Sequence, residues 1–328
     1  MRVKLHDIRH LVAAAVLSIV VALGMDAQVD AAFSHFWLGQ SYYNPAVAGE
    51  LSAIRLNVGS RMQWVDFKHA PMTFYFATDM PYKLLGQRWG VGAKVEFERI
   101  GLYTNSRIGA QLAWKRKIGK GTFSVGIQPG VFSQTFRGNE AITVDDETTG
   151  SSTTQDIPTQ NVSGTVFDAN VGVYYTHPKY WAGFSVTHIM SPTIELKVSR
   201  EATQMWEFKV GRSYYFMGGG NIPINNTLFD IQPSAMFAMT ENFWTAQVAA
   251  KLRYNRMFSI GAGYRYKDAV SAFIGVNLKD AYIGYAYDYP VSAISKATFG
   301  SHEVFITYHV KLDPKEKNKN KQKSVRLM

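Results

Sequence analysis

The chain has 328 residues, a net charge of +10, and a composition in which 46% of the residues are hydrophobic but only 18% are charged. Charged residues make up about 25% of an ordinary soluble domain, so the low share here argues against one. Aromatic residues are abundant, with 20 Phe, 18 Tyr and 7 Trp, and the absence of cysteine excludes disulfides, a thiol nucleophile and a cysteine-ligated metal.

Residues 1–27 have the pattern of a secretory signal peptide. Arg2, Lys4 and Arg9 give a positive start, and the apolar run from Leu11 to Met25 follows. A helix that crosses a bilayer needs roughly 20 apolar residues, so this run is too short to be a membrane span. We therefore expect cleavage after residue 27 and export of the remaining chain.

Residues 28–52 show no sustained strand or helix periodicity. Their centre, SYYNPAVAGE, is rich in turn-forming residues, and the Asn44-Pro45 pair favours an extended or turn conformation over a helix. The prediction for this segment is that it either lies in the periplasm or plugs the barrel that the following residues indicate.

From residue 53 to residue 312 the sequence repeatedly alternates between apolar and polar residues. In the last such segment, Val304 and Ile306 alternate with Glu303 and Thr307. Because successive side chains of a strand point to opposite faces, each segment forms a strand with one apolar and one polar face. The predicted strands are 54–64, 74–76, 91–97, 107–115, 123–136, 166–177, 180–189, 207–218, 228–240, 243–254, 257–266, 270–278, 281–289 and 300–312.

Amphipathic strands in an exported chain predict an all-β fold, a single antiparallel transmembrane β-barrel of the bacterial outer membrane over residues 53–312. The strand count is 14, within a range of 12 to 16, and an even number suits a bacterial barrel. The polar stretch 137–163 is the longest predicted connection, and 190–206 and 290–299 lie at the same end. Because such barrels have long loops outside and short turns inside, the lysine-rich tail 313–328 is predicted to lie in the periplasm.

If the apolar face contacts lipid, the other face lines the lumen. Charges of both signs on that face predict a salt-bridged filling more than a pore of one dominant sign. The charged residues on the predicted lumen face are Arg55, Arg61, Lys94, Glu96, Arg107, Lys115, Asp168, Asp230, Lys251, Arg253, Arg265, Asp288, Glu303 and Lys311.

The sequence has no constellation typical of an enzyme. It contains no G-x-S-x-G elbow, Walker loop or H-E-x-x-H motif. His302, Glu303 and His309 have the wrong spacing for a zinc site on a strand. We therefore predict no catalytic residue, no cofactor and no metal, and an exported barrel gives no reason to expect a nucleic-acid partner.

Three short stretches together resemble a known family, the PorP/SprF outer-membrane proteins of the type IX secretion and gliding apparatus. The first is Asn44-Pro45-Ala46-Val47-Ala48-Gly49, and the second contains Arg61, Gln63 and Trp64. The third is the closing pair Tyr287-Asp288-Tyr289 and Gly300-Ser301-His302-Glu303. The candidate partner-contact or family-motif residues are accordingly Asn44, Pro45, Ala46, Gly49, Arg61, Gln63, Trp64, Tyr287, Asp288, Tyr289, Gly300, His302 and Glu303.

The resemblance implies a non-enzymatic barrel that supports the export of cargo bearing a C-terminal sorting domain. Besides outer-membrane lipid, the implied partners are a periplasmic ring lipoprotein, a peptidoglycan-binding linker protein and a secreted adhesin. The residues themselves leave a second function open, a porin or solute-uptake channel with the same charged lumen. The lysine-rich tail is longer than the compact endings of the family.

Overall fold

The computed structural model describes residues 30–141, 158–199, 202 and 204–312. The predicted signal peptide 1–27, the tail 313–328 and most of the connection 137–163 lie outside these residues. Within the part of the chain that is described, no helix is long and apolar enough to cross a membrane.

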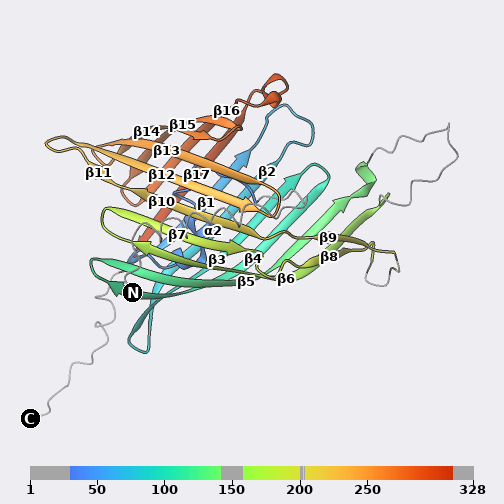
Figure 1. Cartoon of the computed structure of the whole chain (residues 1–328), viewed down its shortest axis with the longest axis horizontal. Coiled ribbons are helices and arrows are strands. Elements are labelled where there is room, and N and C mark those ends of the chain that lie inside the picture. The colour runs from blue at the N-terminus through green and yellow to red at the C-terminus, as the bar shows by residue number, and fades with distance from the viewer. Residues whose placement is uncertain (1–29, 142–157, 200–201, 203, 313–328) are drawn as a thin grey trace, which may run out of the picture.

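Fourteen antiparallel strands form a closed barrel, as the sequence predicts (Figure 1). The barrel strands are β1 Ala53–Met62, β2 Met72–Leu84, β3 Gln87–Ile100, β4 Tyr103–Ile118, β5 Gly121–Arg137, β6 Asn161–Thr176, β7 Tyr180–Thr187, β10 Ser213–Gly220, β12 Phe229–Thr240, β13 Trp244–Tyr254, β14 Phe258–Arg265, β15 Ala269–Leu278, β16 Ala281–Pro290 and β17 Ser301–Lys311.

Each barrel strand pairs with the next barrel strand in the chain, and one further pairing, between the first strand and the last, closes the ring. The first strand, β1, pairs with the last, β17, over ten residue pairs from Ala53↔Lys311 to Met62↔His302. On the opposite side β10 pairs with β12, and the short strand β11 Ile222–Pro223 also adds to β12. Closure leaves the barrel sheet without a free edge, which is what a strand in lipid requires.

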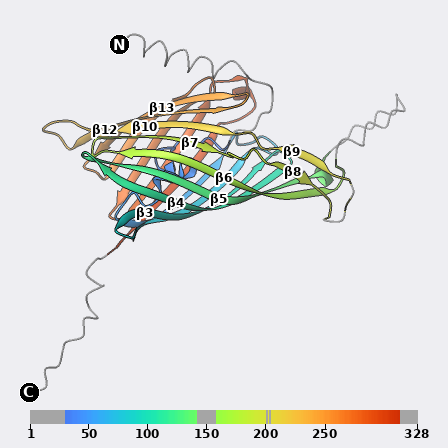
Figure 2. The same ribbon diagram turned by 60° about the horizontal axis from the view of Figure 1, so that its bottom comes forward.

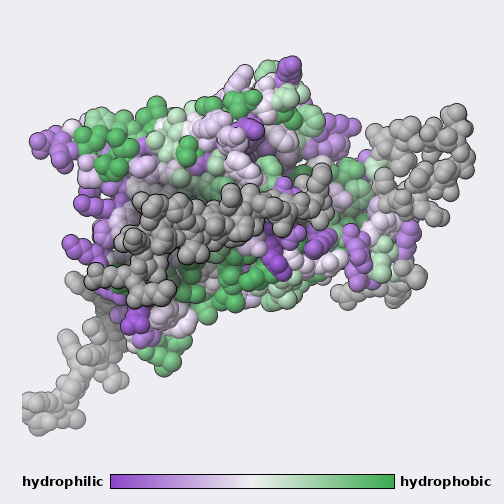
Figure 3. Space-filling model, in the orientation of Figure 1, coloured by the Kyte–Doolittle hydropathy of each residue, from purple (hydrophilic) through white to green (hydrophobic). Residues whose placement is uncertain are grey.

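The alternation of the sequence separates the two faces of the wall. In β17, Val304 and Ile306 are 42% and 38% exposed, whereas Glu303 and Phe305 are 1% and 0% exposed. Apolar side chains therefore cover the outside, and Figure 3 shows them gathered over the strands with hydrophilic residues at the two ends of the barrel. The charged face points inward, as the pattern predicts.

The two ends of the barrel differ in their connections. One end, called the long-loop end below, holds the long connections 63–71, 138–160, 188–212 and 291–300 and three short ones, 101–102, 241–243 and 266–268. The other, the short-turn end, holds Ala53, Lys311 and the connections 85–86, 119–120, 177–179, 221–228, 255–257 and 279–280. The longest predicted connection is shorter than 137–163, because β5 continues to Arg137 and β6 begins at Asn161.

The prediction of one strand over 207–218 is wrong in its first part. Strand β9, Trp206–Lys209, pairs with β8, Thr193–Leu196, in a separate hairpin. The physical reason is burial, since Ile194 and Leu196 pack in an apolar cluster with Val162 on β6. Trp206–Lys209 alternates like a barrel strand, but its partner is the hairpin.

Residues 30–50, called the inner segment below, lie inside the ring of strands (Figure 1 and Figure 2). They contain the short helix α2 Gln40–Tyr43 and the 3₁₀ turn η1 Pro45–Val47. Every residue of both is buried. The core of the molecule is therefore the contact between this segment and the inward face of the wall.

Candidate functional site

The inner segment packs its aromatic residues against aromatic residues of the strands. Phe33, Tyr42 and Tyr43 are at most 2% exposed. Phe33 and Tyr42 make an edge contact at 5.1 Å between ring centroids, and Tyr42 makes another with Tyr75 of β2 at 5.1 Å. Tyr43 reaches Tyr215 of β10, on the other wall, at 5.0 Å. These rings span the lumen from wall to wall.

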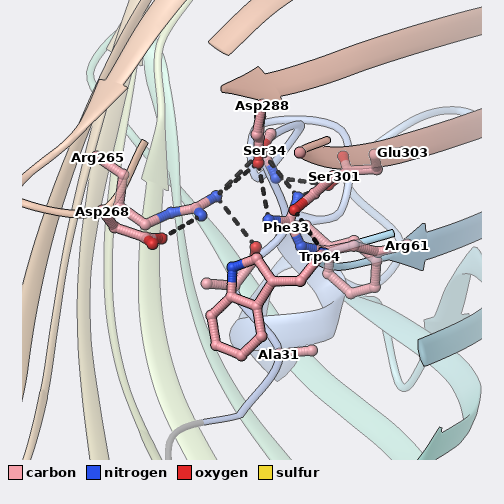
Figure 4. Close-up of polar contacts among 12 residues, drawn as sticks. Ala31, Phe33, Ser34, Arg61, Trp64, Arg265, Asp268, Asp288, Ser301 and Glu303 are labelled. Atoms are coloured by element: carbon pink, nitrogen blue, oxygen red, sulfur yellow. Dashed lines mark hydrogen bonds and ion pairs between the residues drawn. The ribbon is translucent and has the colours of Figure 1, made fainter. Parts of the chain in front are cut away.

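A cluster of four charged residues binds the inner segment beside the seam of the barrel, where β1 pairs with β17. Arg61 of β1 lies 2.7 Å from Asp288 of β16 and 3.2 Å from Glu303 of β17. Arg265 of β14 lies 3.6 Å from the Asp288 carboxylate. The four side chains are at most 4% exposed, and Figure 4 shows both guanidinium groups pointing toward Asp288 and Ser34. We call these four residues the seam cluster.

Ser34 is the residue of the inner segment on which the seam cluster converges. Its hydroxyl donates to Asp288 at 2.6 Å and accepts from Arg61 at 3.1 Å and from Arg265 at 3.0 Å. Its backbone N–H donates to Glu303 at 2.7 Å. The side chain is small enough for three charged groups to meet around one oxygen, so a bulky residue here would separate them.

Glu303 binds the next residue as well. The backbone N–H of His35 donates to one carboxylate oxygen at 2.8 Å, and the His35 ring nitrogen Nδ1 lies 2.8 Å from the same oxygen. Together with Ser34 and Arg61, these contacts use both carboxylate oxygens of Glu303. A buried carboxylate with this many partners is satisfied, and losing any one of them leaves a buried charge short of donors.

A second charged cluster holds the start of the inner segment on the opposite wall. Asp30 accepts hydrogen bonds from Tyr215 at 2.9 Å and from Thr187 at 3.0 Å, and its other oxygen lies 3.0 Å from Nε2 of His188. The remaining ring nitrogen of His188 contacts Asp168 of β6. The imidazole therefore bridges two carboxylates, one from the segment and one from the wall.

In this second cluster, the carboxylate of Asp30 and the imidazole of His188 each stabilise the charged form of the other. Burial opposes ionisation of Asp30, but His188 and then Arg107 hold the pKa of its carboxyl well below the usual range. Burial also favours the neutral ring of His188, but the carboxylates of Asp30 and Asp168 raise its pKa to about 9. Near neutral pH the His188 ring is thus protonated where it bridges the carboxyl groups of Asp30 and Asp168.

Between the two clusters, the wall of β3 and β4 contributes a third set of contacts. The Tyr42 hydroxyl donates to Glu96 at 2.8 Å, and Lys94 donates to the Tyr42 carbonyl at 3.1 Å. Arg107 pairs with Glu96 and also with Glu98, at 3.4 Å. The mixed charges of the lumen thus form a salt-bridged filling, as the sequence predicts, with the inner segment at its centre.

The Asn44-Pro45-Ala46-Val47-Ala48-Gly49 motif forms the turn that carries the inner segment toward β1. The Asn44 side chain accepts from the backbone N–H of Ala46 at 2.9 Å and donates to the Val173 carbonyl of β6 at 2.9 Å. It therefore fixes the turn and joins it to the wall. Gly49, with a φ of 65°, donates its N–H to Asp79 at 2.7 Å.

Glycines on the inward face of the strands make room for this turn. A Cβ at Gly90 would lie 1.8 Å from the Ala48 carbonyl oxygen, and one at Gly126 would lie 2.4 Å from the Ala46 nitrogen. A Cβ at Gly172 would lie 2.2 Å from the Asn44 side-chain oxygen. Glycine in a strand often marks the close approach of other atoms, and here those atoms are backbone and the Asn44 side chain of the inner segment.

The structure brings some of the sequence-predicted candidate residues together and separates others. Arg61, Asp288 and Glu303 meet in the seam cluster. Asn44, Pro45, Ala46 and Gly49 lie together in the turn near the short-turn end, buried and away from that cluster.

The remaining candidates lie on the rim of the long-loop end or on the outside of the wall. The Trp64 backbone N–H donates to the Ser301 hydroxyl at 3.1 Å, next to Gln63 and Gly300. Tyr287 donates to the Phe299 carbonyl at 2.6 Å, and its ring lies 5.4 Å from that of His302. Tyr289 is 58% exposed on the outer face. Direct partner contact by any of these residues stays a prediction.

Sequence reasoning missed the residues of the inner segment that the charged clusters hold, Asp30, Ser34 and His35. The signal that points to their position is the set of inward-facing strand glycines, since each leaves space for a backbone. Among the described residues, no group of three or more His, Asp or Glu side chains has an arrangement that could hold a metal ion.

Comparison with solved structures gives distant similarities. The Pseudomonas putida toluene transporter TodX matches with 11% identity and a TM-score of 0.47, over 89% of this chain and 96% of its own. The monoaromatic hydrocarbon channel CymD matches with 11% identity and a TM-score of 0.48, over 87% and 95%. Acinetobacter baumannii Omp33 matches with 7% identity and a TM-score of 0.41, over 79% and 98%. At such identities the similarity concerns the fold alone.

Comparison with curated proteins finds no significant match. Comparison with protein families does, and it covers most of the chain. Residues 25–308 match the family described as "Type IX secretion system membrane protein PorP/SprF". The match spans the inner segment, both charged clusters and nearly the whole barrel. The chain therefore belongs to the PorP/SprF family of type IX secretion system membrane proteins.

Proposed function

We propose that this protein is a non-enzymatic scaffold of the type IX secretion and gliding machinery. Family membership implies an outer-membrane component of that system, and the proposal concerns its role there. The barrel couples a periplasmic ring lipoprotein and a peptidoglycan-binding linker protein to the export of cargo with C-terminal sorting domains. Its surfaces do this work, and its lumen is not the route of transport.

The observation that carries the scaffold role is the fixed inner segment. Residues 33–36 and 40–49 are buried, and charged or polar groups of β1, β3, β14, β16 and β17 bind the segment. A barrel built for the free passage of solutes keeps an open aqueous lumen. A lumen filled by hydrogen-bonded backbone and aromatic rings supports the role of a plug for residues 28–52.

The proposal places the short-turn end in the periplasm, because outer-membrane barrels have short turns on that side. The ring lipoprotein and the linker protein then contact the connections 119–120 and 177–179. The proposal assigns the tail 313–328 to the same side. The long-loop end faces the exterior, where a secreted adhesin is met. The Asn44–Gly49 turn lies near the periplasmic side and serves first to hold the plug.

The test is deletion of the gene, followed by comparative proteomics of the cell surface, medium and periplasm. Loss from the exterior of every cargo with a C-terminal sorting domain supports a core part of the machine. Loss of one large adhesin alone supports a component dedicated to that cargo. If export is unchanged, the secretion role is wrong.

A solute channel is the competing function, and one observation favours it. A cavity of about 680 Å³, which opens at the long-loop end, is lined by Asp30, Trp64, Arg265 and neighbouring residues. Such a volume is ordinary for a small-molecule site. Transport, however, requires a path past the inner segment. A high ion conductance of the unaltered protein would indicate a channel, and almost none would indicate a scaffold.

A further inference from the structure

The lumen near the short-turn end contains a lysine that differs from the other buried lumen cations. Lys251 of β13 is 8% exposed. In the described part of the chain, no hydrogen bond or ion pair to its ammonium group is found, whereas Arg55 and Arg253 nearby pair with Asp79 at 2.8 Å and with Asp230 at 2.7 Å. Burying an unpaired charge is costly, so a group of this kind needs a reason.

Two aromatic rings flank the ammonium group. It lies 5.8 Å from the centroid of the Trp37 ring and 5.2 Å from the centroid of the Tyr282 ring. Both distances are within the roughly 6 Å at which a ring attracts a cation. The rings carry no net charge, so they flank the ammonium group without supplying a counter-ion.

Lys251 lines two neighbouring cavities, and residues of the inner segment line both of them as well. One, of about 290 Å³, is walled by Pro178, Trp181 and Pro233; the other, of about 210 Å³, is walled by Tyr282 and Thr307. Trp37 and Lys251 line both cavities. Among the described residues that line them there are four Lys or Arg side chains and no Asp or Glu, and two of the four, Arg55 and Arg253, already pair with carboxylates outside the cavities. The electrostatic environment favours an anion.

We propose that these cavities form a binding site for the carboxylate side chain of an acidic peptide segment, with Lys251 as the ion-pair partner. One ammonium group suits one negative charge, whereas phosphate groups are bound by arginine forks or several backbone N–H groups. The proline and aromatic walls suit the apolar stem and neighbouring residues of a peptide. The site deepens the proposed function, because it gives a periplasmic partner a point of attachment beneath the plug.

The test uses the purified full-length protein in non-ionic detergent and isothermal titration calorimetry. The probe is hexaglutamate with blocked ends, and hexaglutamine with blocked ends is the uncharged control. Hexaglutamate is expected to bind the unaltered protein, more weakly as salt rises. The Lys251→Met variant should bind at least tenfold more weakly, and Lys251→Arg should retain most of the affinity. Lys83→Met, which removes an exposed lysine near the end of β2 at the same end of the barrel, should have no effect.

Equal affinity of the unaltered protein and Lys251→Met overturns the proposal, and so does binding of hexaglutamine. Equal binding of free glutamate shows a small-anion site and also overturns it.

Heat-modifiable migration in gel electrophoresis checks that each variant is folded. If Lys251→Met does not fold, Gln232→Glu replaces it, because residue 232 is paired with Lys251 across the sheet and a carboxylate there should occupy the ammonium group. Failure of binding leaves the secretion role to the proteomic test, so the two outcomes are distinguishable.

Discussion

The guanidinium of Arg61 joins the beginning of the barrel to its end. It lies on β1, whereas its two carboxylate partners, Asp288 and Glu303, come from β16 and β17. The same carboxylates bind Ser34 of the inner segment. One side chain therefore contributes to closure of the barrel and to anchoring of the inner segment, because both depend on the same two carboxylates.

Replacing Arg61 by Met should destabilise the protein by about 3–5 kcal/mol, because two buried carboxylates lose a shared cation. The measurement is chemical unfolding in detergent micelles. Arg116→Met is the matched control; it removes an exposed arginine of β4 and should change the free energy of unfolding by about 0.5 kcal/mol or less. Equal losses in the two variants would contradict the role of the seam cluster.

The second cluster predicts a dependence of stability on alkaline pH. The pKa of His188 rises from its ordinary value of 6.5 to about 9 in the folded protein. Folding therefore favours the protonated ring, and its contribution is complete below about pH 6.5 and lost as the pH rises through 9. Midpoints of thermal unfolding of the unaltered protein and of His188→Asn should differ at pH 6 and converge above pH 9. A constant difference would show that the ring contributes through packing alone.

At the scale of elements, the inward face of the strands and the surface of the inner segment are complementary in shape. The turn Pro45–Val47 fits against β3, β5 and β6 because Gly90, Gly126 and Gly172 have no side chain where it passes. Aromatic rings of the segment pack in the lumen against buried residues of the strands. The contact is steric as well as electrostatic. Substitutions that remove a charge, such as Arg61→Met, and substitutions that add volume, such as Gly90→Ala, therefore test the two contributions separately.

Gly90→Ala should displace the turn, because its Cβ would lie 1.8 Å from the Ala48 carbonyl oxygen, which is backbone. Overpacking of this kind costs about 1–3 kcal/mol. Limited proteolysis followed by mass spectrometry should reveal new cleavage within residues 30–50. Gly218→Ala on β10 is the control, since its nearest atom would be at 3.5 Å. An unchanged cleavage pattern in Gly90→Ala would show that the turn does not depend on this space.

The strands were accessible to sequence reasoning because each has its own alternation. The inward direction of Arg61, Asp288 and Glu303 followed from that period alone. Their meeting with Ser34 did not, because Ser34 and Glu303 are 269 residues apart and the inner segment has no period of its own. The β8–β9 hairpin was missed for a related reason: alternation shows that a strand has two faces but does not identify its partner.

At the scale of the whole molecule, the barrel is a wall built around a segment of its own chain. This arrangement predicts almost no ion conductance for the unaltered protein in planar bilayers. Deletion of residues 30–50 should raise the conductance at least tenfold, because the rings and backbone that fill the lumen are removed. Gly218→Ala should behave like the unaltered protein. High conductance without the deletion would favour the solute channel.

The path of the inner segment decides whether the described chain crosses the membrane an even or an odd number of times. An even number of strands alone would leave the two termini of the chain on one side. The inner segment, however, runs from Asp30 near the long-loop end to Glu50 at the short-turn end, through the lumen. Between residue 30 and residue 311, the inner segment and the strands together therefore cross the bilayer an odd number of times. A single cysteine in place of Ala31 and one in place of Lys311 would therefore be reached by impermeant thiol reagents from opposite sides of the membrane, in a protein with no cysteine of its own.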